Sequence, residues 1–98
     1  MREDRQRLDK WLWFARFVKS RTLAAKLVSD GFVRINGQRA ETPAKPIAVG
    51  DVLTVAVART TAVVRVEALG SRRGPAPEAR QLYLELDRDD GAAGQAQT

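Results

Sequence analysis

Apolar residues recur at helical spacing between Ser20 and Gly31, at intervals of three and four, which is the pattern of one apolar helix face. Ser20 suits the N-cap because its hydroxyl can accept a hydrogen bond from an amide of the first turn. Gly31 suits the left-handed position that ends a helix. Residues 32–35 then favour a strand, and Asn36-Gly37 favours a type I′ hairpin turn, which requires positive φ at both central positions. The segment therefore predicts a helix, a strand, a tight turn and a returning strand.

Residues 8–19 predict an earlier helix that is apolar on nearly all sides. A helix of this kind is usually buried on two sides, so we interpret its aromatic residues as core. The alternative is that Trp11 or Trp13 stays open and stacks on a base or on a partner protein. We expect the two helices to pack as a hairpin.

The remainder of the chain predicts strands separated by loops. Prolines interrupt regular structure at 41–46, and Gly, Pro and Arg residues predict a flexible basic loop at 70–77. Alternating or β-branched segments predict three further strands, over residues 52–57, 62–69 and 81–86. The charged segment 1–6 is expected to fray. Residues 88–98 offer almost nothing to bury and are expected to be disordered.

Charge identifies the class of partner. The 98 residues carry a net charge of +5, with 44% hydrophobic and 30% charged residues, as in a single soluble domain. Residues 1–39 hold ten Lys/Arg against four Asp/Glu, whereas residues 40–98 hold seven against eight. A basic N-terminal half favours an anionic partner, with nucleic acid first and an acidic membrane surface second. No signal peptide or membrane span is visible, and the absence of Cys fits the cytoplasm.

The sequence offers little for catalysis. It contains no His, the commonest general base, and without Cys it lacks the usual ligands of a zinc site. Neither of the Gly-rich phosphate-binding motifs occurs. We therefore expect a protein that is not an enzyme and that uses no cofactor or metal.

Phosphate binding is better supported, because it needs long cationic side chains on a rigid frame and amides or hydroxyls at a helix start. If the helices form a hairpin, the junction brings three cations close to the start of the second helix. The candidate residues spread over the two helices and their junction: Arg7, Lys10, Arg16, Lys19, Ser20 and Arg21.

The motifs RLDKWL at 7–12, SR at 20–21 and ING at 35–37 resemble the RNA-binding domain named after ribosomal protein S4. The RLDKWLW opening and the RRGPA segment at 72–76 are more specifically similar to the fifteen-kilodalton, ribosome-associated heat-shock protein family. The resemblance implies an α+β fold with the α-L motif, in which two packed helices lie on a small, strongly bent antiparallel sheet. It implies an RNA-binding core at 7–55, and we read residues 56–87 as a β extension of the same domain.

The resemblance also implies a partner, namely structured ribosomal RNA of the large subunit, on free large subunits that still carry a nascent chain, with ribosomal proteins nearby. It adds three RNA-facing candidates from the hairpin and the loop after it: Gln38, Arg39 and Lys45. Members of this family often continue into a Lys/Arg-rich extension, whereas this sequence ends in acidic and small polar residues, so we expect affinity or placement to differ.

Three rival interpretations remain open. The two helices are compatible with a DNA-binding helix-turn-helix, although the second helix is mostly Leu, Ala and Val. Trp13, Phe14 and Phe17 are compatible with a protein–protein adaptor. An RNA-modifying activity is the third rival, since such RNA-binding modules are often attached to enzymes. We expect a monomer.

Overall fold

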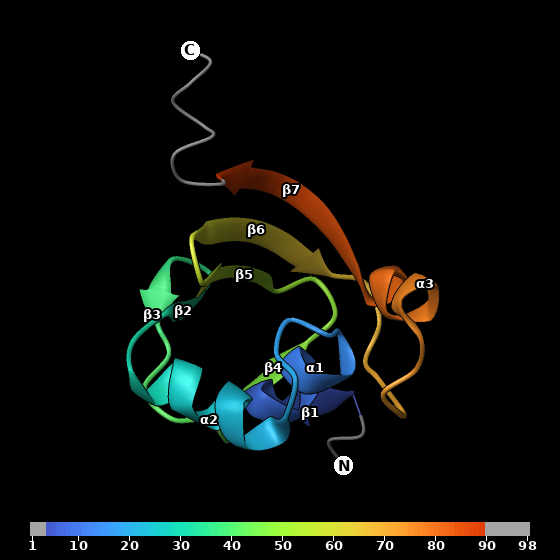
Figure 1. Cartoon of the computed structure of the whole chain (residues 1–98), viewed down its shortest axis with the longest axis horizontal. Helices are drawn as coiled ribbons and strands as arrows, with labels where there is room; N and C mark the ends of the chain where they lie inside the picture. Colours follow the sequence, from blue (N-terminus) through green and yellow to red (C-terminus); the bar gives the residue numbers. More distant parts are fainter. Residues whose placement is uncertain (1–3, 90–98) are drawn as a thin grey trace.

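Two short helices, α1 (Leu8–Phe14) and α2 (Arg21–Ser29), pack against each other on one side of an arched antiparallel sheet (Figure 1). The computed structural model describes residues 4–89. They have the mixed α+β architecture, with two packed helices on a bent sheet, that the sequence predicts.

The sheet has the order β3-β2-β5-β6-β7 within the described residues, and every neighbouring pair is antiparallel. Its strands are β2 (Val33–Ile35), β3 (Gln38–Arg39), β5 (Val52–Val57), β6 (Thr60–Val66) and β7 (Tyr83–Asp89). A separate ribbon pairs β1 (Arg5–Arg7) with β4 (Pro46–Ala48). The ribbon ties the chain before α1 to the loop that follows the β2–β3 hairpin.

The local signals of the segment 20–39 are confirmed. Ser20 caps α2, because its Oγ accepts a hydrogen bond from the Leu23 amide at 3.1 Å. Gly31 has φ 87° just after the helix, and Asn36 and Gly37 have φ 51° and 86° in the turn. The Asn36 side chain also accepts the amide of Val52 at 2.9 Å, which joins the turn to β5. The turn is therefore stabilised by a side-chain hydrogen bond in addition to its favourable backbone geometry.

The first helix is shorter than predicted, ending at Phe14 instead of residue 19. Arg16 adopts φ 66°, its amide donates to the Trp13 carbonyl, and the Phe17 amide donates to the Leu12 carbonyl at 3.0 Å. This pattern is a Schellman motif, which usually places Gly at the left-handed position. Because Arg occupies that position here, the sequence carries no glycine signal for the end of the helix.

Other predicted boundaries also need correction. Arg5 and Gln6 belong to β1 instead of a frayed end, and β4 begins at Pro46 within the predicted loop. The loop expected at 70–77 runs into a short helix, α3 (Ala76–Ala79), followed by a 3-10 turn (Arg80–Leu82). The last strand includes Arg88 and Asp89, which were expected in a disordered tail. The rest of that tail, residues 90–98, lies outside the described residues.

Trp11 lies at the centre of the core. It has no exposed surface, its Nε1 donates to the Ala68 carbonyl at 3.0 Å, and Phe17 and Tyr83 pack against its ring. The interpretation of Trp11 as core is confirmed, and its alternative role as an open stacking platform is wrong. The helices and the sheet both contribute to this core, through Leu8, Leu12, Ala24, Val28, Val33, Ile47, Leu53, Val55, Val64 and Val66.

Phe14 is likewise buried, with 5% of its surface exposed, so it cannot serve the adaptor surface that the sequence left open. Between residues 4 and 89, no helix combines the length and the apolar character that crossing a membrane requires.

The turn at Asn36-Gly37 gives a test of the fold. A Cβ at Gly37 meets no atom within 4 Å, so the cost of a substitution comes from positive φ alone. We expect Gly37→Val to lower the free energy of unfolding by about 1–3 kcal/mol, since a β-branched residue is strongly disfavoured there. Gly37→Asn is the matched control and should lose less, because Asn tolerates this region. Equal losses in chemical denaturation would contradict this account of the turn.

Candidate nucleic-acid interface

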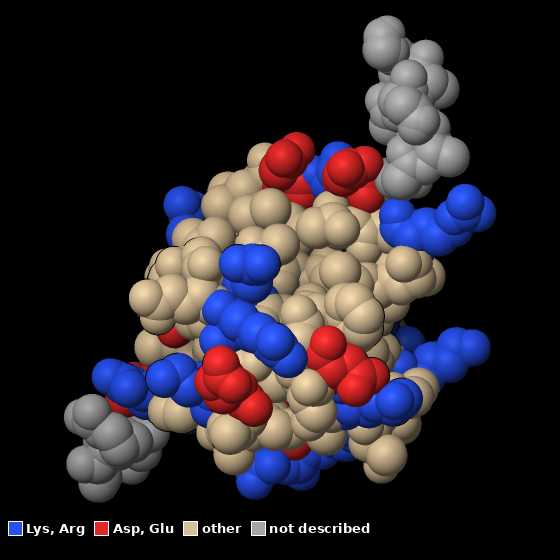
Figure 2. Space-filling view, turned by 90° about the vertical axis from the view of Figure 1, so that its left-hand side faces the viewer, with Lys and Arg blue, Asp and Glu red and all other residues tan. Residues whose placement is uncertain are grey.

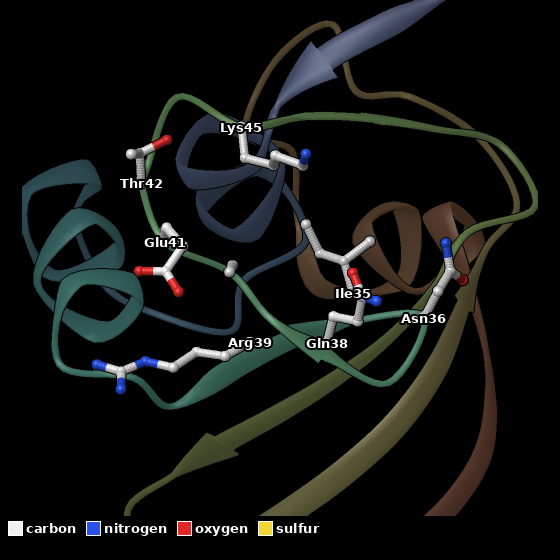
Figure 3. A pocket seen from close by; sticks show the side chains of 8 residues that line it. Ile35, Asn36, Gln38, Arg39, Glu41, Thr42 and Lys45 are labelled. Carbon is white, nitrogen blue, oxygen red and sulfur yellow. The ribbon is translucent and has the colours of Figure 1, made fainter.

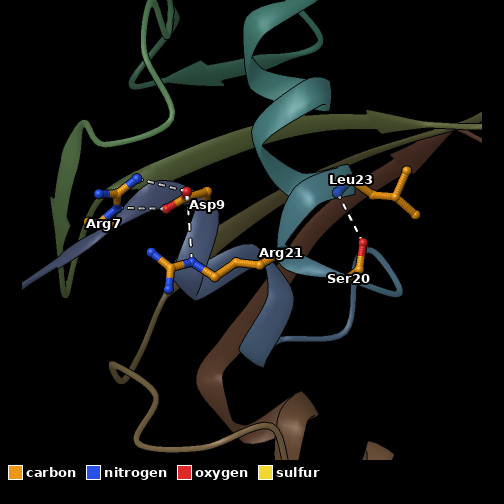
Figure 4. Close-up of polar contacts among 5 residues, drawn as sticks. All are labelled: Arg7, Asp9, Ser20, Arg21 and Leu23. Atoms are coloured by element: carbon orange, nitrogen blue, oxygen red, sulfur yellow. Dashed lines mark hydrogen bonds and ion pairs between the residues drawn. The ribbon is translucent and has the colours of Figure 1, made fainter.

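A buried carboxylate holds two arginines at the start of the helices (Figure 4). Arg7 donates from Nε and Nη2 to the two carboxylate oxygens of Asp9, at 3.1 and 3.0 Å. Arg21 Nε lies 3.8 Å from Asp9 Oδ2. The Asp9 side chain is only 5% exposed, whereas those of Arg7 and Arg21 are 50% and 43% exposed. One buried anion therefore orients two half-exposed cations.

The electrostatics of this group favour an anionic ligand. The hydrogen bond from Arg7 to Asp9, together with the negative charge of Asp9, raises the pKa of Arg7 above its ordinary value. The guanidinium is thus charged at every physiological pH. Because Asp9 offsets only one of the two positive charges, the group stays cationic, and its exposed N–H groups face solvent.

The β1–β4 ribbon places Lys45 beside Arg7. The Leu8 amide donates to the Lys45 carbonyl at 2.9 Å, and Arg7 pairs in register with Pro46. Lys45 also lines a cavity of about 540 Å³, together with Gln38, Arg39 and Glu41 (Figure 3). We call the four cations Arg7, Arg21, Arg39 and Lys45 the basic strip.

Figure 2 shows the face of the molecule on the side of β2 and β3, with Lys and Arg side chains across its middle and lower parts and acidic groups among them. Arg39 is directed toward the end of α2, since its nearest guanidinium atoms lie 2.8 Å from the position that a Cβ on Gly31 would occupy. The guanidinium of Arg39 therefore packs beside Gly31.

The three cations predicted to gather at the start of α2 have different neighbours in the structure. Arg16 donates from Nε to the Gly74 carbonyl at 2.6 Å, Arg21 pairs with Asp9, and Lys19 lines an apolar groove. The remaining two candidates also have neighbours within the fold. Lys10 Nζ lies 5.7 Å from the centre of the Phe14 ring, and Ser20 Oγ is used in the helix cap.

Sequence reasoning missed Arg73, which braces the junction between the helices. Its Nε donates to the Trp13 carbonyl and its Nη2 to the Val18 carbonyl, both at 3.2 Å. Together with the bond from Arg16 to Gly74, these contacts fix the segment between α1 and α2 from a loop that was expected to be flexible. Sequence reasoning also missed the pairing of Asp9 with Arg7 and Arg21. The available signal was the RRGPA motif at 72–76, whose role only the tertiary structure reveals.

Comparison with known proteins gives the family. Residues 6–53 match the S4 domain, and the chain is 44% identical over 79 residues to heat shock protein 15 of Escherichia coli K12. A trimeric structure of heat shock protein 15 from Vibrio cholerae matches with a TM-score of 0.78 and 40% identity, covering 95% of this chain and 88% of that one. The chain belongs to the heat shock protein 15 family. This confirms the resemblance seen in the sequence.

Two further comparisons concern a ribosomal relative and the share of each protein that aligns. The small ribosomal subunit protein uS4 of Xanthobacter autotrophicus is 38% identical over 90 residues, which cover 41% of that protein. The alignment with E. coli heat shock protein 15 covers 81% of this chain and 59% of that protein, so this chain spans about three fifths of that relative. The S4 match contains the four cations of the basic strip.

The brace by Arg73 can be tested with its neighbour as the control. Arg73→Lys removes the planar fork that reaches two carbonyls, because an ammonium cannot reproduce this geometry. We expect faster hydrogen exchange of the amides at 15–20 and earlier proteolysis there, with the charge unchanged. Arg72→Lys should have little effect, since Arg72 forms an exposed pair with Glu78. Identical exchange in the two variants would show that Arg73 does not brace the junction.

Proposed function

We propose that this protein binds structured RNA through the basic strip and that it acts without catalysis. The observation that carries the proposal is the pair of guanidinium groups held by buried Asp9. Lys45 and Arg39, which line the neighbouring cavity, extend this row of cations. Arg groups match phosphate oxygens in a fork geometry, and contacts to the phosphate backbone position a nucleic acid on a protein. Membership of the S4 domain family supports the same assignment.

Each part of the site has its own role in this proposal. Asp9 reduces the mutual repulsion of Arg7 and Arg21, and it orients both before RNA arrives. The cavity beside the strip offers the amide group of Gln38 to riboses or base edges. RNA is commonly recognised through its shape, its 2′-hydroxyls and its unpaired bases, which such a surface suits.

The proposed target is ribosomal RNA of the large subunit, on free subunits that carry a nascent chain, in the cytoplasm. The similarity to a ribosomal protein and to heat shock protein 15 supports a ribosomal partner, and the family resemblance of the sequence suggests the large subunit. Co-sedimentation with separated subunits tests this extension. Enrichment with small subunits would contradict it and leave RNA binding itself intact.

The trimeric structure from V. cholerae bears on assembly. That relative covers 95% of this chain, and large apolar side chains of this chain are exposed. We therefore propose a trimer, in place of the monomer expected from the sequence alone.

Salt dependence tests the strip directly. Each phosphate that a protein cation neutralises steepens the fall of log K with log salt. We expect the double variant Arg21→Gln, Lys45→Gln to have a slope shallower by roughly one to two units. The control is Arg59→Gln, Arg65→Gln, which removes the same charge away from the strip and should change the slope less. Equal slopes for the two variants would refute the strip, and tighter binding to duplex DNA than to folded RNA would favour the helix-turn-helix rival.

A second test separates the arrangement of the arginines from net charge. Asp9→Asn raises the net charge by one but removes the anion that orients Arg7 and Arg21. We expect RNA affinity to fall by about two- to tenfold, the cost of immobilising loosened side chains on binding. Glu41→Gln raises the net charge by the same amount at the cavity and should increase affinity. If both variants bound more tightly, charge alone would explain the binding.

A further inference from the structure

An apolar groove of about 520 Å³ lies between α2 and the end of β5. Leu23 and Phe32 on its wall are 46% and 51% exposed, unusually open for such large apolar side chains. Figure 4 shows Leu23 directed away from the group formed by Arg7, Asp9 and Arg21. The groove and this ion-pair group therefore lie on different sides of α2. Its apolar lining consists of Phe17, Val18, Leu23, Leu27, Phe32 and Val57.

A second apolar surface lies on β7, where Leu84 and Leu86 are 46% and 47% exposed. β7 is an edge strand that pairs with β6, and within residues 4–89 no strand lies on its other side. Figure 1 places β7 and α2 on opposite sides of the molecule. The chain thus presents two separate apolar surfaces that face in different directions.

The symmetry of a trimer explains why two surfaces are present. A closed ring of three copies needs a head-to-tail interface, in which one surface of each copy meets a different surface of the next. A single self-complementary surface gives dimers instead. Exposed apolar surfaces commonly mark sites of protein association.

We propose that Leu84 and Leu86 of one copy seat in the α2–β5 groove of the next copy, and that three such contacts close a ring. The occupant of the groove is thus a second copy of this chain, and the inference rests on the trimer proposed above. Charge supports the pairing. The groove carries Lys19 and Lys26 against Asp30, whereas β7 (Tyr83–Asp89) carries three acidic residues against one Arg.

This contact leaves Arg7 and Arg21 outside the interface, because their group with Asp9 and the groove lie on different sides of α2. It also gives Lys19 a role at the rim of the interface in place of RNA contact. A ring then presents three copies of the strip, and linked sites bind a large RNA more tightly than separate ones.

Analytical ultracentrifugation of the purified full chain at micromolar concentration tests the ring. We expect the wild-type protein to sediment as a trimer. Leu23→Glu and Leu84→Glu should each sediment as a monomer, and their circular dichroism spectra should show that both are folded. Val49→Glu is the matched control, because Val49 is 58% exposed and lies outside both surfaces, and it should stay trimeric. A monomeric wild type would overturn both the trimer and this interface. A trimeric wild type with trimeric Glu variants would overturn the interface alone.

Mixing the two Glu variants decides whether the contact is head-to-tail. Leu23→Glu keeps an intact β7, and Leu84→Glu keeps an intact groove, so one native contact can form between them. We expect a one-to-one dimer in the mixture, whereas each variant alone stays monomeric. A mixture that remains monomeric, or a dimer formed by either variant alone, would overturn the proposal. RNA binding by the wild-type protein is measured in parallel, and its absence would count against the RNA-binding proposal and leave the interface intact.

Discussion

The buried carboxylate of Asp9 is the interaction on which the proposed interface depends. A charged group is costly to bury unless it is paired and hydrogen-bonded, and Arg7 and Arg21 supply that pairing from β1 and α2. The same contacts join the strand before α1 to both helices. The fold and the basic strip thus share one ion-pair group, so the arginines are oriented before any ligand binds.

The junction between the helices depends on a second set of contacts from distant sequence. Arg73 donates hydrogen bonds to the Trp13 and Val18 carbonyls. The Gly74 carbonyl accepts a hydrogen bond from the side chain of Arg16. They stabilise a helix end in which Arg occupies a position that usually takes Gly. The loop after β6 is therefore part of the framework that holds α2 beside α1. We therefore expect a substitution at Arg73 to change the basic strip without contacting a ligand.

Much of the fold was predictable because its signals are local. The Ser20 cap, the Gly31 stop and the Asn36-Gly37 turn each depend on the conformation of a few adjacent residues. The end of α1 and the β1–β4 ribbon were missed because contacts between distant segments determine them. In the candidate site, charge and residue type indicated Arg7 and Arg21, and the family resemblance added Arg39 and Lys45. No pattern in the sequence indicates that Arg16 turns toward Gly74. Side-chain direction depends on tertiary neighbours, which spacing alone does not give.

The central claim is that RNA contacts the arginines oriented by Asp9. Titration of the ¹⁵N-labelled protein with a folded fragment of ribosomal RNA, followed through the arginine Nε–Hε signals in NMR, tests it most directly. We predict large shifts for Arg7 and Arg21 and unchanged signals for Arg59 and Arg65, which serve as internal controls within the same sample. Unchanged Arg7 and Arg21 signals in a saturated complex, or equal shifts for all four arginines, would contradict the claim.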